Sequence, residues 1–350
     1  MDEAKRVAVN IVTWNSMAYL PNLLSSLDEQ DTRDFMVTMV DNASTDGTVA
    51  WLQEQRPDVA ALRNFRNQGF ARAHNQAIAM VLSRWSEDAL ESRYVLVTNP
   101  DLEFASDAIR KLTEFMDAHP EIAACGPKLL RAKTVAGDLD GGRETDRTTI
   151  IDSAGIVMYR SRRHADRGAG EEDTNQYAAG DVFGLSGACA MFRASALVAS
   201  KLAGEVFDED FFAYKEDVDL AWRMRRLGYR AAYVPEAIAW HHRRAKSVEQ
   251  GFLWLKAFVH RFTKPAYANR LSTRNHVWLI IKNDSFWNII MHLPWILPYE
   301  FGKTLVGLFS PSTWQAWGQA IIGIPGIWKK RNELSKRTVI QPSQTRRWFV

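Results

Sequence analysis

Short apolar runs alternate with amphipathic stretches through the first part of the chain. The apolar runs predict buried strands at residues 6–14, 35–44, 61–65, 92–101 and 122–130. The stretches between them repeat apolar residues at helical spacing and predict helices at 17–30, 46–55, 70–82 and 106–120, the last with Ser106 as N-cap. This alternation predicts a Rossmann-like α/β fold, a mostly parallel sheet with helices on both faces.

The pattern changes further along the chain. Residues 133–180 are rich in Gly, Asp, Arg and Thr, which predicts long loops with short strands. Residues 216–228 predict a helix with a basic side, closed by Gly228. Further strands are predicted within 152–160, 182–193 and 229–242. Beyond Ala245, helical aromatic patterns are interrupted by Pro294, Pro298, Pro311 and Pro325.

Charge divides the chain unequally. Residues 1–242 contain 27 Lys and Arg against 37 Asp and Glu, a net −10, whereas residues 243–350 contain 17 against 4, a net +13. The basic segment also contains 8 of the 13 tryptophans. A basic, Trp-rich end on an acidic body indicates an anionic partner, either an acidic membrane surface or a nucleic acid. Cys125 and Cys189 lie in apolar runs, which favours a reducing compartment without a disulfide framework.

Polar residues follow the first two predicted strands, in "VTWNS" and "VDNASTDGT". Asp41 can accept a hydrogen bond from a base N–H, Asn42 can add another, and nearby helix N-termini can hold a diphosphate. In "RNFRNQGFARAHN", Arg66 can reach phosphate and Asn75 can line the same site. Turn and capping chemistry is the alternative explanation for all of these residues.

The stretch "TNPDLEF" places Asp101 directly after a predicted strand. Ligands bind at the carboxyl ends of strands in open α/β sheets. Mg²⁺ or Mn²⁺ often uses only one or two carboxylates together with substrate phosphates, so a single aspartate suffices for a metal site. A turn cap after Pro100 is the alternative role.

Six acidic residues fall between Asp208 and Asp219. Glu216 and Asp217 begin a predicted helix, whose dipole stabilises an ionised carboxylate that can serve as a general base. Ordinary enrichment of acids at a helix start is the alternative. Downstream, His241 and His242 are adjacent on a predicted strand and point to opposite faces, so at most one of them joins a metal site.

Together these stretches resemble the inverting nucleotide-sugar glycosyltransferases of family 2, which have the GT-A fold. The likeness is strongest to the rhamnosyltransferase and galactofuranosyltransferase branch. It covers residues 7 to about 247 and leaves the tail from 248 largely uncovered. The matching stretches, in order, are "VTWN", "VDNASTDGT", "NQGFARAHN", "NPD", "DSAG", "DRGAGEEDTNQY", "LSGACAMFR", "FDEDFFAYKEDVDLAWRMRRLGY" and "VPEAIAWHH".

The resemblance implies a role for each matching residue. Asp101 takes the place of the last aspartate of the family's D-x-D metal motif, with Asn99 where many relatives have Asp, so that metal affinity depends more on the bound diphosphate. Asp217 would be the catalytic base, and His241 the second protein ligand of Mg²⁺ or Mn²⁺, with His242 as the fallback. The donor-side residues would be Thr13, Asn15, Asp41, Asn42, Arg66, Asn75, Asn99 and Asp101. The acceptor region would include Gly184, Gly187 and Glu216.

The implied reaction is transfer of a sugar, with inversion, from a nucleotide diphosphate donor to a hydroxyl of a glycan or polyprenyl-diphosphate-linked acceptor in bacterial cell-surface polysaccharide synthesis. L-Rhamnose from dTDP-rhamnose is the first choice and galactofuranose from UDP-galactofuranose the second. A non-catalytic sugar-nucleotide-binding protein is disfavoured by the intact Asp101, Asp217 and His241 set. A nucleic-acid-binding protein is disfavoured because the acidic half would repel phosphate.

We expect a catalytic domain at residues 1–247, with a nucleotide-binding half to about 130 and an acceptor-binding half from 131, followed by a helical segment at 248–350. The segment lacks the roughly 18 uncharged apolar residues of a spanning helix. Its Trp, Lys and Arg fit helices lying in the interface of an anionic membrane. The expected location is therefore cytoplasmic, peripheral on the inner face of the cytoplasmic membrane. A helical cap on the catalytic domain or a homodimer contact is the alternative.

Overall fold

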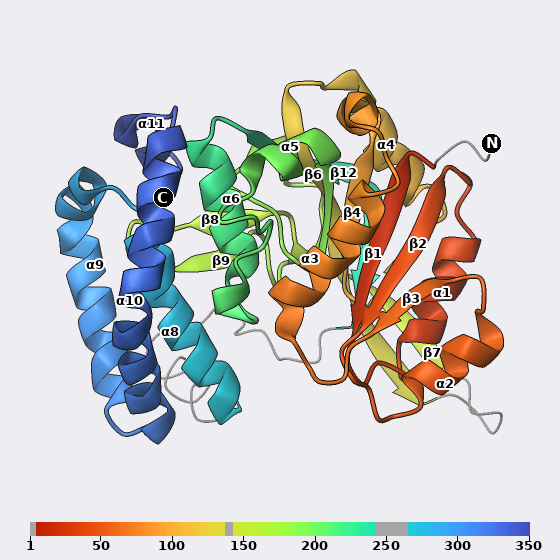
Figure 1. The fold of residues 1–350 in the computed structure, drawn as a ribbon, viewed down its shortest axis with the longest axis horizontal. Helices are drawn as coiled ribbons and strands as arrows, with labels where there is room; N and C mark the ends of the chain where they lie inside the picture. The colour runs from red at the N-terminus through yellow and green to blue at the C-terminus, as the bar shows by residue number, and fades with distance from the viewer. Residues whose placement is uncertain (1–4, 137–142, 243–264) are drawn as a thin grey trace.

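A 10-stranded sheet with helices on both faces forms the centre of the molecule (Figure 1). The computed structural model describes residues 5–136, 143–242 and 265–350. The sheet order is β10-β12-β6-β11-β4-β1-β2-β3, with β5 beside β12 and β7 beside β6. The strands are β1 Val7–Thr13, β2 Phe35–Asp41, β3 Ala60–Arg63, β4 Tyr94–Thr98, β5 Leu102–Phe104, β6 Ile122–Ala136, β7 Arg143–Ser153, β8 Ile156–Met158, β9 His164–Asp166, β10 Gly180–Val182, β11 Cys189–Arg193 and β12 Arg230–His241.

Strands β3, β2, β1 and β4 run parallel, as do β6 and β12, while β11 lies antiparallel between β4 and β6. The α/β fold class is therefore confirmed. The helices are α1 Leu20–Asp28, α2 Thr48–Gln55, α3 Gly69–Leu82, α4 Ala108–Ala118, α5 Ala194–Ser200, α6 Glu216–Arg226, α8 Ala266–Asn283, α9 Phe286–Gly307, α10 Pro311–Arg337 and α11 Pro342–Arg346, with short 3-10 helices η1 Glu87–Ser92 and η2 Glu209–Phe211.

Two hydrophobic cores lie on opposite faces of the sheet because side chains alternate along each strand. Val7, Val9 and Ile11 of β1 pack with the buried leucines of α1 and the apolar side of α4. Ala8 of β1 and Val95 of β4 pack in the other core, with α3, α5 and α6. The sheet is thus buried on both faces, which explains the nearly continuous apolar runs of the parallel strands.

Two details of the sequence prediction were wrong. The N-cap of α4 is Asp107 rather than Ser106, whose carbonyl instead accepts a hydrogen bond from the Asp31 amide. Residues 133–136 and 143–153, whose polar composition had indicated loops, form the end of β6 and the antiparallel strand β7. The predicted basic side of α6 is present, and two of its residues, Arg223 and Arg225, are buried and donate to the carbonyls of Ser200 and Phe183.

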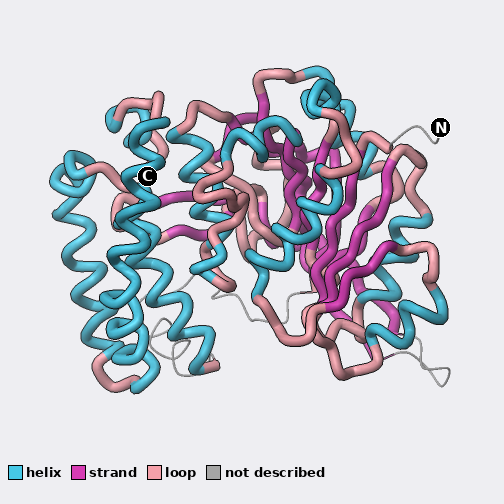
Figure 2. Tube along the Cα trace, in the orientation of Figure 1, coloured by secondary structure: helices cyan, strands magenta, loops and turns pink. Residues whose placement is uncertain are grey.

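The C-terminal helices form one end of the molecule, opposite the parallel strands (Figure 2). They are joined to the rest by a third core, in which Trp222 of α6 meets Trp278 and Leu279 of α8 and Ile327 of α10. Pro294 and Pro298 lie inside α9 and Pro325 lies inside α10, so these prolines do not end their helices. The expected domain boundary at 247 lies outside the described residues. Within the described part of the chain, no helix is both long and apolar enough to cross a membrane.

Candidate functional site

Strands β1, β2 and β4 end together at one edge of the sheet, where their register pairs Thr13 with Asp41 and Ile11 with Thr98. The Thr13 hydroxyl donates to Asp41 Oδ1 at 2.9 Å, and the Ser44 amide donates to Asp41 Oδ2 at 3.0 Å. The Asp41 side chain is buried, so its carboxylate is held in one orientation at this edge.

The loops after β1 and β2 are tied together by asparagine side chains. Asn15 has a positive φ of 51°, and its side-chain oxygen accepts from the Thr45 amide at 2.8 Å. Asn42 donates its side-chain amide to the carbonyl of Gly69, at the start of α3, at 3.1 Å. The structure therefore brings Thr13, Asn15, Asp41 and Asn42 together.

The other two polar residues of this predicted group are not hydrogen-bonded to these four within the described residues, although Asn64 and Gln68 of the Arg66 loop both donate to Asn42 Oδ1. Arg66 is exposed on the loop between β3 and α3. Asn75 of α3 donates to the carbonyl of Phe207 at 2.8 Å and accepts from the Phe207 amide at 2.9 Å. Asn75 is thus bonded to the segment that leads into α6.

Asp101 and His241 face each other next to the end of β4. Asp101 Oδ1 lies 3.3 Å from His241 Nε2, and His241 Nδ1 lies 2.8 Å from Asp152 Oδ2 of β7. Although burial opposes the shift, Asp101 and Asp152 raise the pKa of His241 to about 10. A carboxylate on the far nitrogen is the usual means by which proteins orient a metal-binding histidine.

The adjacent His242 points to a different partner. Its Nε2 lies 2.9 Å from Glu103 Oε1. The two histidines have different partners because neighbouring residues of a strand face opposite sides. The geometry therefore favours His241 over His242 as a partner of Asp101. Asp152 is a site residue that we did not single out from the sequence, although it begins the stretch "DSAG".

A divalent cation between Asp101 Oδ1 and His241 Nε2 would have to displace the Nε2 proton that the raised pKa of His241 favours, and it would take its remaining ligands from a diphosphate and water. Within the described ranges, no group of three or more His, Cys, Asp or Glu side chains forms a metal site on its own. The two side chains fit a cation whose binding depends on a second, phosphate-bearing ligand.

Two residues before β11 connect the edge that carries Asp101 to α6. The Ala188 carbonyl accepts from the Asn99 amide at 2.9 Å, and the Gly187 amide donates to Asp217 Oδ2, also at 2.9 Å. The Val218 amide donates to Asp217 Oδ1 at 2.8 Å. Asp217, at the first turn of α6, therefore lies near the same edge of the sheet as Asp101.

Two neighbouring carboxyl groups at this helix start have different environments. Burial raises the pKa of Asp217, and the hydrogen bonds from the Gly187 and Val218 amides oppose that shift. Burial and the charge of Asp217 raise the pKa of Glu216 far above its ordinary value, and Glu216 Oε2 has no hydrogen-bond partner among the described residues. The pair thus favours a proton on Glu216 and negative charge on Asp217.

Gly184 and Gly187 allow close contacts with α6. A β-carbon on Gly184 would lie 2.3 Å from that of Ala221, so the absence of a side chain there permits helix packing. A β-carbon on Gly187 would lie 3.2 Å from that of Asp217. Of the two glycines, Gly187 is the one beside the candidate base.

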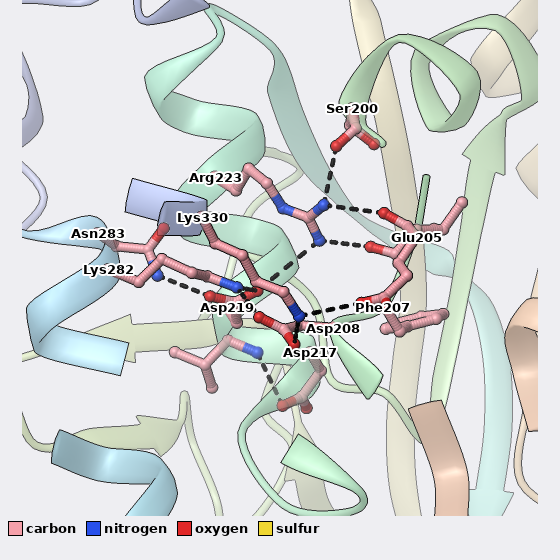
Figure 3. Close-up of polar contacts among 12 residues, drawn as sticks. Ser200, Glu205, Phe207, Asp208, Asp217, Asp219, Arg223, Lys282, Asn283 and Lys330 are labelled. Carbon is pink, nitrogen blue, oxygen red and sulfur yellow. Dashed lines mark hydrogen bonds and ion pairs between the residues drawn. The ribbon is translucent and has the colours of Figure 1, made fainter. Parts of the chain in front are cut away.

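The remaining acids of the 208–219 run include two that serve a structural purpose (Figure 3). Lys282 of α8 contacts both Asp208 and Asp219, the latter at 2.7 Å, and Lys330 of α10 donates to Asp208 at 2.5 Å. Although burial alone would raise it, the two lysines hold the pKa of Asp208 well below its ordinary range. The density of this acidic run therefore reflects both a site and an ion-pair cluster.

Comparison with known proteins identifies the family of this sequence. Residues 8–199 match the model of "Glycosyl transferase family 2", and residues 151–325 match that of "Glycosyl transferase family group 2". Over 247 residues the chain is 32% identical to the N-acetylglucosaminyl-diphospho-decaprenol L-rhamnosyltransferase of two Mycobacterium tuberculosis strains, covering 66% of this chain and 74% of the relative.

The fold is also shared with a solved structure. The chain superposes on GalNAc-T7, solved with UDP, GalNAc and Mn²⁺, with a TM-score of 0.58 and 12% identity. The match covers 94% of this chain but only 55% of GalNAc-T7, and at this identity the likeness concerns the fold alone.

Proposed function

This chain belongs to glycosyltransferase family 2 and has the GT-A fold, and we propose from that premise that it transfers L-rhamnose from dTDP-rhamnose to a hydroxyl of a lipid-linked glycan. The name of the mycobacterial relative supports both the sugar and the lipid-linked acceptor. The observation that carries the proposal is the placement of Asp101 and His241 at the edge where Asp41 lies, joined to Asp217 through Gly187 and Ala188.

In the proposed mechanism, Asp217 accepts the proton of the acceptor hydroxyl while that oxygen attacks the anomeric carbon. Attack from the face opposite the nucleotide inverts the configuration. The amides of Gly187 and Val218 orient the Asp217 carboxylate for this proton transfer. Asp101 and His241 would hold Mg²⁺ or Mn²⁺, which neutralises charge on a departing diphosphate. Asp152 keeps His241 Nε2 directed at Asp101.

A panel of sugar nucleotides with Mn²⁺ tests the donor. We expect dTDP-rhamnose to bind most tightly in titration calorimetry and to be hydrolysed slowly without acceptor, because the mycobacterial relative is an L-rhamnosyltransferase and Asp41 can receive the imide N–H of thymine. UDP-galactofuranose is the second candidate, since uracil offers the same imide. Equal, weak binding of every sugar nucleotide would contradict the proposed function.

We also propose that the outer side of α9 rests on the membrane that holds the acceptor, with residues 1–247 as the catalytic unit and 248–350 as the membrane-facing part. The charged residues of α9, Glu300 and Lys303, pair at 2.8 Å, and Glu300 also lies 2.7 Å from His276 of α8. The exposed residues of α9 are apolar: Phe286, Trp287, Ile290, Met291, Trp295, Leu297, Phe301 and Leu305.

A bilayer suits this face better than a protein partner does. Aromatic and aliphatic side chains along one exposed helix, without an exposed carboxylate, are typical of helices lying in the membrane interface. Arg160, an exposed residue of the β8–β9 turn, lies 5.0 Å from the Trp295 ring, where it can meet an anionic headgroup.

Flotation of the full chain with anionic vesicles tests the membrane face. We expect the double substitution Trp287→Ser, Phe301→Ser to weaken vesicle binding at least tenfold, whereas Phe65→Ser, which removes an exposed aromatic outside the C-terminal helices, leaves it unchanged. Equal flotation of all three proteins, or a wild-type dimer that the double substitution dissociates, would contradict membrane contact at α9.

A further inference from the structure

The loop that leads into the first turn of α6 has an unusual backbone. Phe212, Tyr214 and Lys215 have φ values of 64°, 71° and 73°, although none of them is glycine. A β-carbon crowds the backbone in this left-handed region, so three such residues within four positions persist only if the surroundings hold them. Asp217 follows two residues later.

Two neighbouring side chains of α8 bond to this loop. Arg274 donates to the carbonyls of Asp210 at 2.7 Å and Phe211 at 3.1 Å, and Asn275 reaches further along the loop. Asn275 of α8 is fully buried, and its side-chain nitrogen lies 2.9, 2.9 and 2.7 Å from the carbonyl oxygens of Phe211, Ala213 and Tyr214. Its side-chain oxygen accepts from Arg274 Nε at 2.9 Å. Three carbonyls on one side and a guanidinium on the other require this orientation of the amide, since only the nitrogen end donates.

The opposite side of the loop rests on α3. The Ala71 amide donates to the Phe212 carbonyl at 3.2 Å, and a β-carbon on Gly69 would lie 2.4 Å from that carbonyl oxygen. Gly69 is also the residue whose carbonyl accepts from Asn42. The loop is therefore held between the helix that borders the Asp41 site and a helix of the C-terminal segment.

We infer that Asn275 is a positioning residue for the transfer reaction, which keeps the loop 211–215 in the conformation that places the Asp217 carboxylate at the acceptor hydroxyl. The inference rests on the proposed function. All three carbonyls that Asn275 contacts belong to this loop, whereas α8 is anchored separately through Trp278, Leu279 and Lys282. Loss of the Asn275 amide should therefore leave α8 in place and free the part of the loop at Ala213 and Tyr214, while Arg274 still bonds to Asp210 and Phe211.

Two substitutions and one control separate positioning from stability. Asn275→Asp keeps the size of the side chain but sets a carboxylate against three carbonyls, and Asn275→Ala removes the amide. Asn283→Ala removes another buried amide of α8, which donates to Asp219 Oδ1 at 2.7 Å and does not contact the loop.

Steady-state transfer with dTDP-rhamnose, Mn²⁺ and a lipid-linked acceptor gives the first measurement. We expect both Asn275 variants to lose about 10²-fold in kcat, the scale of a misplacement of about 1 Å. Their donor KM should stay within about threefold of wild type, and their melting temperatures should fall no further than that of Asn283→Ala. A kcat within about threefold of wild type, or a loss no greater than that of Asn283→Ala, would overturn the inference.

Hydrogen exchange provides a measurement that does not depend on activity. In Asn275→Ala the amides of residues 211–217 should exchange at least tenfold faster than in wild type and in Asn283→Ala. Unchanged exchange there would overturn the inference by itself. If Asn275→Ala exchanges faster but the wild type transfers no sugar, the proposed function would be refuted. The conclusion that Asn275 holds the loop would still be supported.

Discussion

The orientation of His241 toward Asp101 depends on a third side chain, that of Asp152. Asp152 binds the far nitrogen of His241 although the two lie 89 positions apart in the chain. This arrangement points His241 Nε2 at Asp101 and leaves His242 bonded to Glu103. The metal role of Asp101 and His241 stays a prediction, and the structure gives it a specific geometry.

Replacing the two candidate ligands should abolish the metal dependence of nucleotide binding. We expect Asp101→Ala and His241→Ala to weaken binding of dTDP in the presence of Mn²⁺ by at least tenfold, while binding without metal changes little. Titration calorimetry with and without Mn²⁺ measures both quantities. His242→Ala serves as the matched control and should retain the metal-dependent gain; a loss with His242→Ala but not with His241→Ala would reverse the assignment.

The sequence was informative about residues at strand ends and silent about their partners. Asp41, Asp101 and Asp217 each stand next to a recognisable element, so pattern and resemblance identify them. Asp152 and Asn275 act across the fold, on His241 and on the loop before α6. Nothing in the local sequence around either residue specifies which backbone or ring it will meet.

At the scale of elements, the carboxylate of Glu103 links the short strand β5 to helix α1, strand β7 and His242. Glu103 accepts hydrogen bonds from Asn22 of α1 at 3.1 Å and from Arg147 of β7 at 3.1 Å, and contacts His242 at 2.9 Å. Although burial alone would raise it, hydrogen bonds from His242 and Thr145 lower the pKa of Glu103 from 4.5 to about 2.

Glu103→Gln should therefore destabilise the protein in a pH-dependent way. A lowered pKa stabilises the folded state above the unfolded value of 4.5, and this contribution is lost as the pH falls toward 2. We expect a loss of about 1–3 kcal/mol in unfolding free energy at pH 7, from urea titration. The difference from wild type should shrink between pH 4.5 and the lowest pH at which the protein folds; a constant difference would contradict the assignment.

The predictions of helices and strands were correct where the buried positions follow the spacing of a regular helix or strand. The strands of the parallel half and the helices between them were predicted correctly because both sheet faces are covered, which makes the apolar runs strong. Strand β6 was predicted at 122–130, whereas its partner β7 was missed because β7, with the sequence RETDRTTIIDS, is mostly polar. The basic side of α6 was predicted, but the burial of Arg223 and Arg225 was not, because their carbonyl partners lie in distant segments.

At the scale of the whole molecule, the basic C-terminal segment has lysines directed into the protein and an apolar outer surface. Its net charge suggested an anionic partner, yet Lys282 and Lys330 point inward to Asp208 and Asp219 (Figure 3). The net charge of a segment does not tell which way each basic side chain points. The sequence therefore left contact with a membrane surface and a cap on the catalytic domain as alternatives. The described helices pack as a cap through α8 and α10, and α9 offers an apolar outer side.

Deleting residues 265–350 should therefore unfold the protein rather than merely release it from membranes. The deletion would expose Trp222 and Phe211, which are fully buried, and would leave Asp208 and Asp219 without their lysine partners. Loss of one partner of a buried ion pair costs about 3–5 kcal/mol. We expect an insoluble product or one without a cooperative thermal transition; a soluble, cooperatively folding fragment would contradict this packing.

The central claim is that Asp217 is the general base of an inverting sugar transfer, and one paired measurement tests it most directly. Single-turnover transfer from dTDP-rhamnose to a lipid-linked acceptor is compared in wild type and Asp217→Asn, with donor affinity measured on the same preparations. We predict a rate loss of about 10²–10⁴-fold, the range for removal of a general base, with donor affinity within about threefold. A variant that transfers at near wild-type rate, or one whose lost rate is matched by lost donor binding, would contradict the account.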